Sequence, residues 1–81
     1  MNAKAWIASF SRELGVEPPT PEQFGAILDL AAEAAHASER VAAPVACWVS
    51  ARAGRSPEDS LELARRISAG AGTSDPEGPP A

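Results

Sequence analysis

Apolar residues recur along this chain at the three- and four-residue spacings that are typical of amphipathic helices. Trp6, Phe10 and Leu14 mark one such face, and Gly15 follows as a residue that can end a helix in the left-handed conformation. No segment shows a sustained alternation of apolar and polar residues, so a sheet is not expected. The pattern predicts an all-α, compact four-helix domain with helices at about 3–14, 21–37, 44–53 and 57–69.

Hydroxyl residues and prolines indicate where the later helices begin. Thr20 can cap the second helix, and Gln23 stands where its side chain completes a capping box. Ser56 precedes Pro57 and repeats this chemistry at the fourth helix. Pro44 is placed at the start of the third helix, because a proline in a helix interior would clash with the preceding turn.

The same pattern predicts which side chains form the core. The second helix is expected to be central, because its alanine-rich stretch, residues 31–37, has high helix propensity and lets neighbouring helices approach closely. The residues expected to face inward from the third and fourth helices are Val45, Trp48, Val49, Leu61, Ala64 and Ile67. Residues 70–81 contain no large apolar residue and are predicted to be a disordered tail behind a single domain, residues 1–69.

Composition then narrows the class of protein. Of the 81 residues 18 are alanine, and the 18 larger apolar residues are near the minimum for a core without metals, disulfides or a partner subunit. One cysteine and one histidine leave no Cys-based or multi-His metal site, so no cofactor is expected. The formal net charge of −4 argues against nucleic acid as a partner. No apolar run is long enough for a membrane span or a secretory signal, so a cytoplasmic location is expected.

The two tryptophans are candidate interaction residues. A domain of this size cannot easily bury two indoles, and partly exposed tryptophans are enriched at binding hot spots. Trp6 and Trp48 are therefore candidates for a partner or self-association surface, with Arg52 one turn from Trp48 as a plausible neighbour. Packing in the core is the default interpretation for both indoles, and a binding surface is the alternative.

The segment between the third and fourth helices carries a local excess of positive charge through Arg52 and Arg55. It resembles an anion site, but it lacks the glycine spacing and the lysine of a phosphate loop, so a solvated loop is the favoured interpretation. His36 and Arg40 are candidates for a polar junction between the second and third helices. Cys47 is interpreted as a small buried apolar residue, because no neighbouring cation lowers its thiol pKa.

Alanine-rich motifs in the middle of the chain, together with the opening tryptophan, match those of a known family. The motifs are Trp6, Asp29-Leu30-Ala31-Ala32-Glu33-Ala34-Ala35-His36, Glu39-Arg40, Ala42-Ala43-Pro44 and Ala53-Gly54-Arg55. On residues 3–70 the chain resembles an uncharacterised small helical domain of actinobacteria. That domain occurs alone or joined to the C-terminus of molybdopterin-guanine dinucleotide biosynthesis protein A, the molybdenum cofactor guanylyltransferase.

The resemblance implies no catalytic residues, and this chain lacks the glycine-rich nucleotide loop of the guanylyltransferase. The matching positions Asp29, His36, Arg40 and Pro44 imply a polar network at the turn between the second and third helices, and contact with a ligand is the less favoured alternative.

Two functions are therefore weighed. The favoured one is a non-catalytic protein-interaction or accessory domain, linked to molybdenum cofactor biosynthesis, that binds the guanylyltransferase, another protein or a second copy of itself. The alternative is a small-ligand or nucleotide-binding domain that uses Arg52 and Arg55, with His36. No catalytic motif is present, so an enzyme is not expected.

Overall fold

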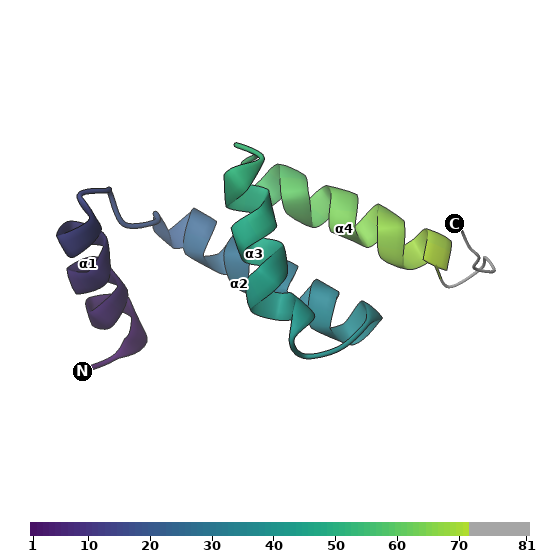
Figure 1. Ribbon diagram of the computed structural model, residues 1–81, viewed down its shortest axis with the longest axis horizontal. Coiled ribbons are helices and arrows are strands. Elements are labelled where there is room, and N and C mark those ends of the chain that lie inside the picture. Colours follow the sequence, from purple (N-terminus) through teal and green to yellow (C-terminus); the bar gives the residue numbers. More distant parts are fainter. Residues whose placement is uncertain (72–81) are drawn as a thin grey trace.

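Four helices make up the described part of the computed structural model, residues 1–71, and this part contains no strand (Figure 1). The helices are α1 (Ala3–Leu14), α2 (Pro21–Ala37), α3 (Ala42–Arg52) and α4 (Pro57–Ala71). The predicted all-α, four-helix class is confirmed. The last helix ends at Ala71, two residues later than predicted, and the rest of the predicted tail lies outside the described residues. Within residues 1–71 no helix has both the length and the apolar character that crossing a bilayer requires.

The helix ends follow the predicted capping chemistry. The Thr20 hydroxyl accepts a hydrogen bond from the Gln23 N–H at 3.1 Å, and the Gln23 side chain accepts one from the Thr20 N–H at 2.9 Å. The Ser56 hydroxyl accepts from the Asp59 N–H at 3.1 Å. Gly15 adopts the left-handed conformation at φ 76° and ψ 28°. The Asn2 side chain caps α1 by accepting from the Ala5 N–H at 2.8 Å, and this cap was not among the predicted ones.

Helix α3 begins earlier than predicted, at Ala42, so Pro44 is its third residue. This position tolerates proline because the first four N–H groups of a helix have no partner within the helix. The helix also ends one residue earlier than predicted, at Arg52.

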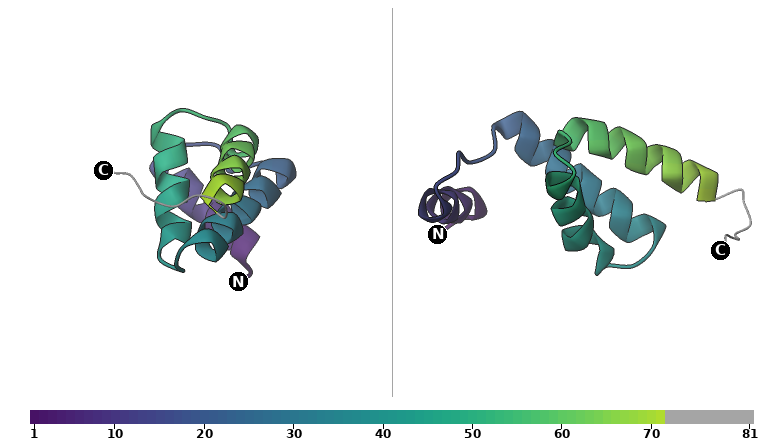
Figure 2. Two further views of the ribbon diagram at one scale, coloured as in Figure 1. Left: turned by 90° about the vertical axis from the view of Figure 1, so that its right-hand side faces the viewer. Right: turned by 45° about the horizontal axis from the view of Figure 1, so that its top comes forward.

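Helices α2, α3 and α4 pack together, and α2 contacts both of the others, as its alanine content predicts. Helices α2 and α4 run side by side in the same direction, while α3 crosses α2 obliquely (Figures 1 and 2). Helix α1 lies at one end of the molecule, and none of its Cα atoms is within 8 Å of a Cα atom of another helix.

The core of this three-helix unit is small. In residues 1–71 the buried apolar side chains are Ala26, Leu30 and Leu61, and Leu30 is the most enclosed at 4% exposure. The predicted inward position of Leu61 is confirmed, whereas Ile67, on the same helix, is 61% exposed. The predictions for Val45, Trp48 and Val49 are wrong, because all three side chains are exposed. Large apolar residues are therefore available at the surface, and they define the candidate site.

Candidate interaction surfaces

Helix α3 is oriented with its large residues in solvent. The outer face of α3, as we call it, consists of Val41, Val45, Trp48 and Arg52, which lie three and four residues apart and are all exposed. Trp48 is 61% exposed. The Arg52 guanidinium carbon lies 5.4 Å from the centroid of the Trp48 ring, which is a cation–π arrangement. The predicted proximity of Trp48 and Arg52 is confirmed.

Small residues hold the opposite side of α3 against its neighbours. This packed side consists of Ala43, Ala46, Cys47 and Ser50, which are all half-buried. The Cys47 thiol lies 3.9 Å from the Ile27 carbonyl oxygen of α2, within reach of a weak hydrogen bond. The hydroxyl groups of Ser50 and Ser60 hydrogen-bond to each other and join α3 to α4. The contact of α3 with its neighbours is thus made by small side chains, while Val45 and Trp48 stay outside it.

An apolar groove of about 420 Å³ opens between α3 and α4. The large side chains that line this α3–α4 groove are Leu30 from α2, Val49 from α3, and Leu63 and Ile67 from α4. Arg55 is the one charged residue of the described chain that lines it. No local sequence pattern predicts this groove, because its walls come from positions up to 37 residues apart, Leu30 and Ile67.

Helix α1 carries a further apolar surface. The α1 stripe consists of Trp6, Phe10 and Leu14, which are exposed and spaced four residues apart. The Trp6 and Phe10 rings stack with their centroids 5.0 Å apart and an interplanar angle of 25°. The candidate role of Trp6 as a surface residue thus agrees with its 54% exposure.

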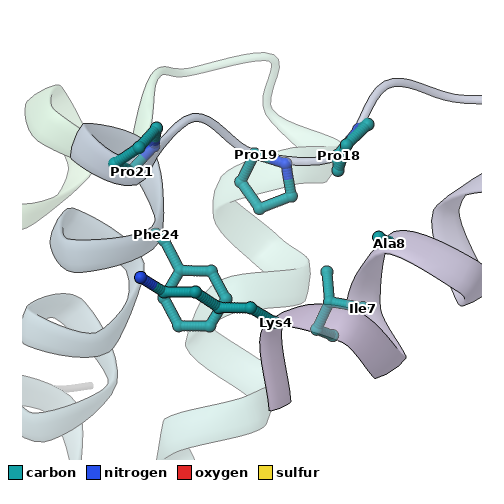
Figure 3. A pocket seen from close by; sticks show the side chains of 7 residues that line it. All are labelled: Lys4, Ile7, Ala8, Pro18, Pro19, Pro21 and Phe24. Atoms are coloured by element: carbon teal, nitrogen blue, oxygen red, sulfur yellow. The ribbon is translucent and has the colours of Figure 1, made fainter. Parts of the chain in front are cut away.

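A different side of α1 attaches it to the rest of the chain. Figure 3 shows the Lys4 side chain lying across the Phe24 ring, with the amine nitrogen 5.9 Å from the ring centroid. A shallow pocket of about 200 Å³ separates the two segments, lined by Lys4, Ile7, Ala8, Pro18, Pro19, Pro21 and Phe24. The stripe of α1 is not used in this attachment.

The predicted polar junction between α2 and α3 does not form as a side-chain network. Among the described residues, the side chains of Asp29, His36 and Arg40 make neither hydrogen bonds nor ion pairs, and all three are exposed. Backbone groups close the turn instead, with hydrogen bonds from the Ala42 N–H to Glu39 and from the Ala43 N–H to Arg40. Pro44 follows this turn as an exposed residue.

The residues of the predicted anion site do not converge. Arg52 lies over Trp48, whereas Arg55 lines the α3–α4 groove. His36 lies in the last turn of α2, at the opposite end of α3 from both arginines, and α3 alone is roughly 16 Å long. Within residues 1–71 no three His, Cys, Asp or Glu side chains are grouped so that they could hold a metal ion.

Burial raises the pKa of the Cys47 thiol. Desolvation disfavours the thiolate, which is the reactive form of cysteine, so this environment suppresses nucleophilic chemistry. The geometry thus agrees with the interpretation of Cys47 as a packing residue.

The fold and these surfaces define a small all-α domain that leaves much of its apolar side-chain area in solvent. A family model, described as a domain of unknown function, DUF6457, matches residues 1–78, and the chain therefore belongs to this family. The resemblance to an uncharacterised small domain is confirmed to this extent. Comparisons with curated proteins and with solved structures gave no match.

Proposed function

We propose that this domain is a non-catalytic interaction module that binds another protein through the outer face of α3. The observation that carries the proposal is the orientation of α3, which packs through alanine, cysteine and serine and keeps Val45 and Trp48 in solvent. Burying large apolar side chains is the main driving force of folding, so a helix that exposes them favours an occupant for that face.

The chemistry of the face suits a protein partner. Tryptophan and arginine are the residue types most enriched at binding hot spots, and here they form one preassembled pair. Arg52 lies over the indole in the free chain, so less side-chain freedom is lost on binding. Val41 and Val45 extend the face by two further turns and add apolar area around the pair.

The first partner to test is a molybdenum cofactor guanylyltransferase. The family that the sequence resembles includes domains joined to the C-terminus of that enzyme, so the enzyme is a natural candidate for a contact. A role in molybdenum cofactor biosynthesis and a cytoplasmic location are parts of this proposal.

Binding to the purified guanylyltransferase of the same organism tests the proposal. Replacing Trp48 and Arg52 together by alanine should weaken binding by about 30-fold or more, the loss typical of a hot spot. The matched control replaces Val16 and Arg65 by alanine, which removes an equally exposed apolar residue and an exposed arginine away from the face. Circular dichroism should show the same folded helix content in all three chains.

Capture from a lysate of the same organism extends the test to other partners. A protein that is recovered by the wild-type chain and lost with the Trp48 and Arg52 variant supports an interaction module with a different partner. Equal recovery of a protein by the wild-type chain and by the Trp48 and Arg52 variant would contradict the proposal. So would a wild-type chain that binds neither the purified guanylyltransferase nor any protein of the lysate.

A further inference from the structure

Two apolar surfaces remain after the outer face of α3 is assigned to a partner. One is convex, the α1 stripe, and the other is concave, the α3–α4 groove. Side chains of α2, α3 and α4 line the groove, so a helix seated in it would contact all three. Helix α1 is amphipathic and has no helix packed against its stripe in the described chain.

Within one chain, α1 is poorly placed to fill the groove. Helix α3 stands between α1 and α4 along the long axis of the molecule, as Figures 1 and 2 show. To reach the groove, α1 would have to pass over α3 on a connector of six residues, 15–20. Pro18 and Pro19 favour an extended connector, and Lys4 lies beside Phe24.

We infer that the α1 stripe of one copy docks into the α3–α4 groove of a second copy, and that the reciprocal contact produces a two-fold symmetric homodimer. This goes beyond the proposed partner binding, because it uses neither Trp48 nor the rest of the outer face of α3. Because each copy gives a stripe and receives one, the assembly is complete at two subunits, and both stripes and both grooves are covered. A one-sided contact would leave one stripe and one groove exposed.

The areas agree with a weak, reversible dimer. The exposed parts of Trp6, Phe10 and Leu14 amount to roughly 300 Å², since an aromatic side chain presents about 150–250 Å² in full. The exposed walls of the groove contribute less than half of that area. Two such contacts bury roughly 800 Å² in total, which is below the range for stable interfaces and is typical of weak, reversible association.

Charge on the two surfaces is complementary. Glu13 lies three residues after Phe10 and therefore borders the α1 stripe, while Arg55 lines the groove. Neither side chain has a hydrogen-bond or ion-pair partner among the described residues. Docking a stripe in the groove of a second copy offers each of these charges an opposite charge.

Sedimentation equilibrium of the full chain over a range of concentrations tests this dimer. Wild-type protein should associate reversibly to a dimer. Phe10→Glu on the stripe and Ile67→Glu in the groove should each raise the dimer Kd by about 30-fold or more, as for other hot-spot substitutions. Val45→Glu is the matched control, because Val45 is 58% exposed on the outer face of α3 and should not affect dimerisation.

Mixing the two variants gives the decisive result. A Phe10→Glu chain keeps its groove and an Ile67→Glu chain keeps its stripe, so the mixture retains one intact contact and should form a heterodimer that neither variant forms alone. The inference is overturned by a monomeric wild type, by open-ended oligomers, by a dimer that Val45→Glu dissociates, or by a mixture that stays monomeric. A monomer that still binds a partner through Trp48 would overturn this inference and leave the proposed function standing.

Discussion

The guanidinium carbon of Arg52 lies 5.4 Å from the ring centroid of Trp48, one turn away on the same face of α3. Both side chains are exposed, so the pair is formed before any partner arrives. An arginine over an indole is attracted by the negative face of the ring, and each side chain restricts the rotamers of the other. The pair therefore places an aromatic ring and a cation side by side on the outer face of α3.

Trp48→Ala should change the free energy of unfolding by less than about 1 kcal/mol. The ring is 61% exposed, so truncation removes little buried area, whereas a tryptophan in a core costs about 3–5 kcal/mol. Urea denaturation followed by circular dichroism measures the difference. A loss of about 3 kcal/mol or more would show that Trp48 is a core residue.

Two leucines of α2 should differ strongly in their contribution to stability. Leu30→Ala should destabilise the domain by about 2–4 kcal/mol, because this side chain is 4% exposed and lies in the small core. Leu28→Ala makes the same chemical change at a site that is 57% exposed and should cost under about 1 kcal/mol. Equal losses in urea denaturation of the two variants would contradict the described core.

Two glycine-to-alanine substitutions should change the stability of the domain in opposite directions. Gly15 ends α1 at φ 76°, so Gly15→Ala should destabilise the helix by about 1 kcal/mol. Gly25 lies inside α2, where an added Cβ would meet no atom within 4 Å, so Gly25→Ala should stabilise it by about 0.5–1 kcal/mol. Thermal unfolding of both variants beside the wild type measures the signs directly.

The Cys47 thiol should make stability depend on pH in alkaline solution. Burial raises its pKa in the folded chain, so folding favours the protonated form. The resulting stability is fully present below the thiol pKa of the unfolded chain and is lost as pH rises through the folded value. Unfolding free energies measured from neutral to alkaline pH should therefore fall more steeply for the wild type than for Cys47→Ala. Equal slopes would mean that the thiol pKa is the same in the folded and unfolded chains.

Local chemistry in the sequence predicts the helices well. The capping box of Thr20, the hydroxyl of Ser56 and the left-handed Gly15 depend on residues at most three positions apart, so the sequence alone identifies them. The proximity of Trp48 and Arg52 also follows from their spacing of four residues on one helix.

The orientation of α3 and the presence of the groove could not be predicted from local sequence patterns of this kind. Assigning the largest apolar residues to the core placed Val45 and Trp48 inward, but α3 contacts α2 and α4 through Ala46, Cys47 and Ser50. The signal was present in the sequence as small residues at helical spacing on one face of α3. The groove depends on how α2, α3 and α4 cross, and no local pattern specifies those angles.

The separation of α1 from the other helices has a thermodynamic consequence. A helix of 12 residues is marginal in water by itself, because its nucleation cost is shared by few hydrogen bonds. The contacts of Ile7 and Lys4 with the start of α2 are modest, so α1 gains much of its order from whatever covers its stripe. If the stripe docks on a second copy as inferred above, helix formation at residues 3–14 and association of the chain are one coupled equilibrium, and protein concentration then sets the fraction of chains in which the first helix is formed.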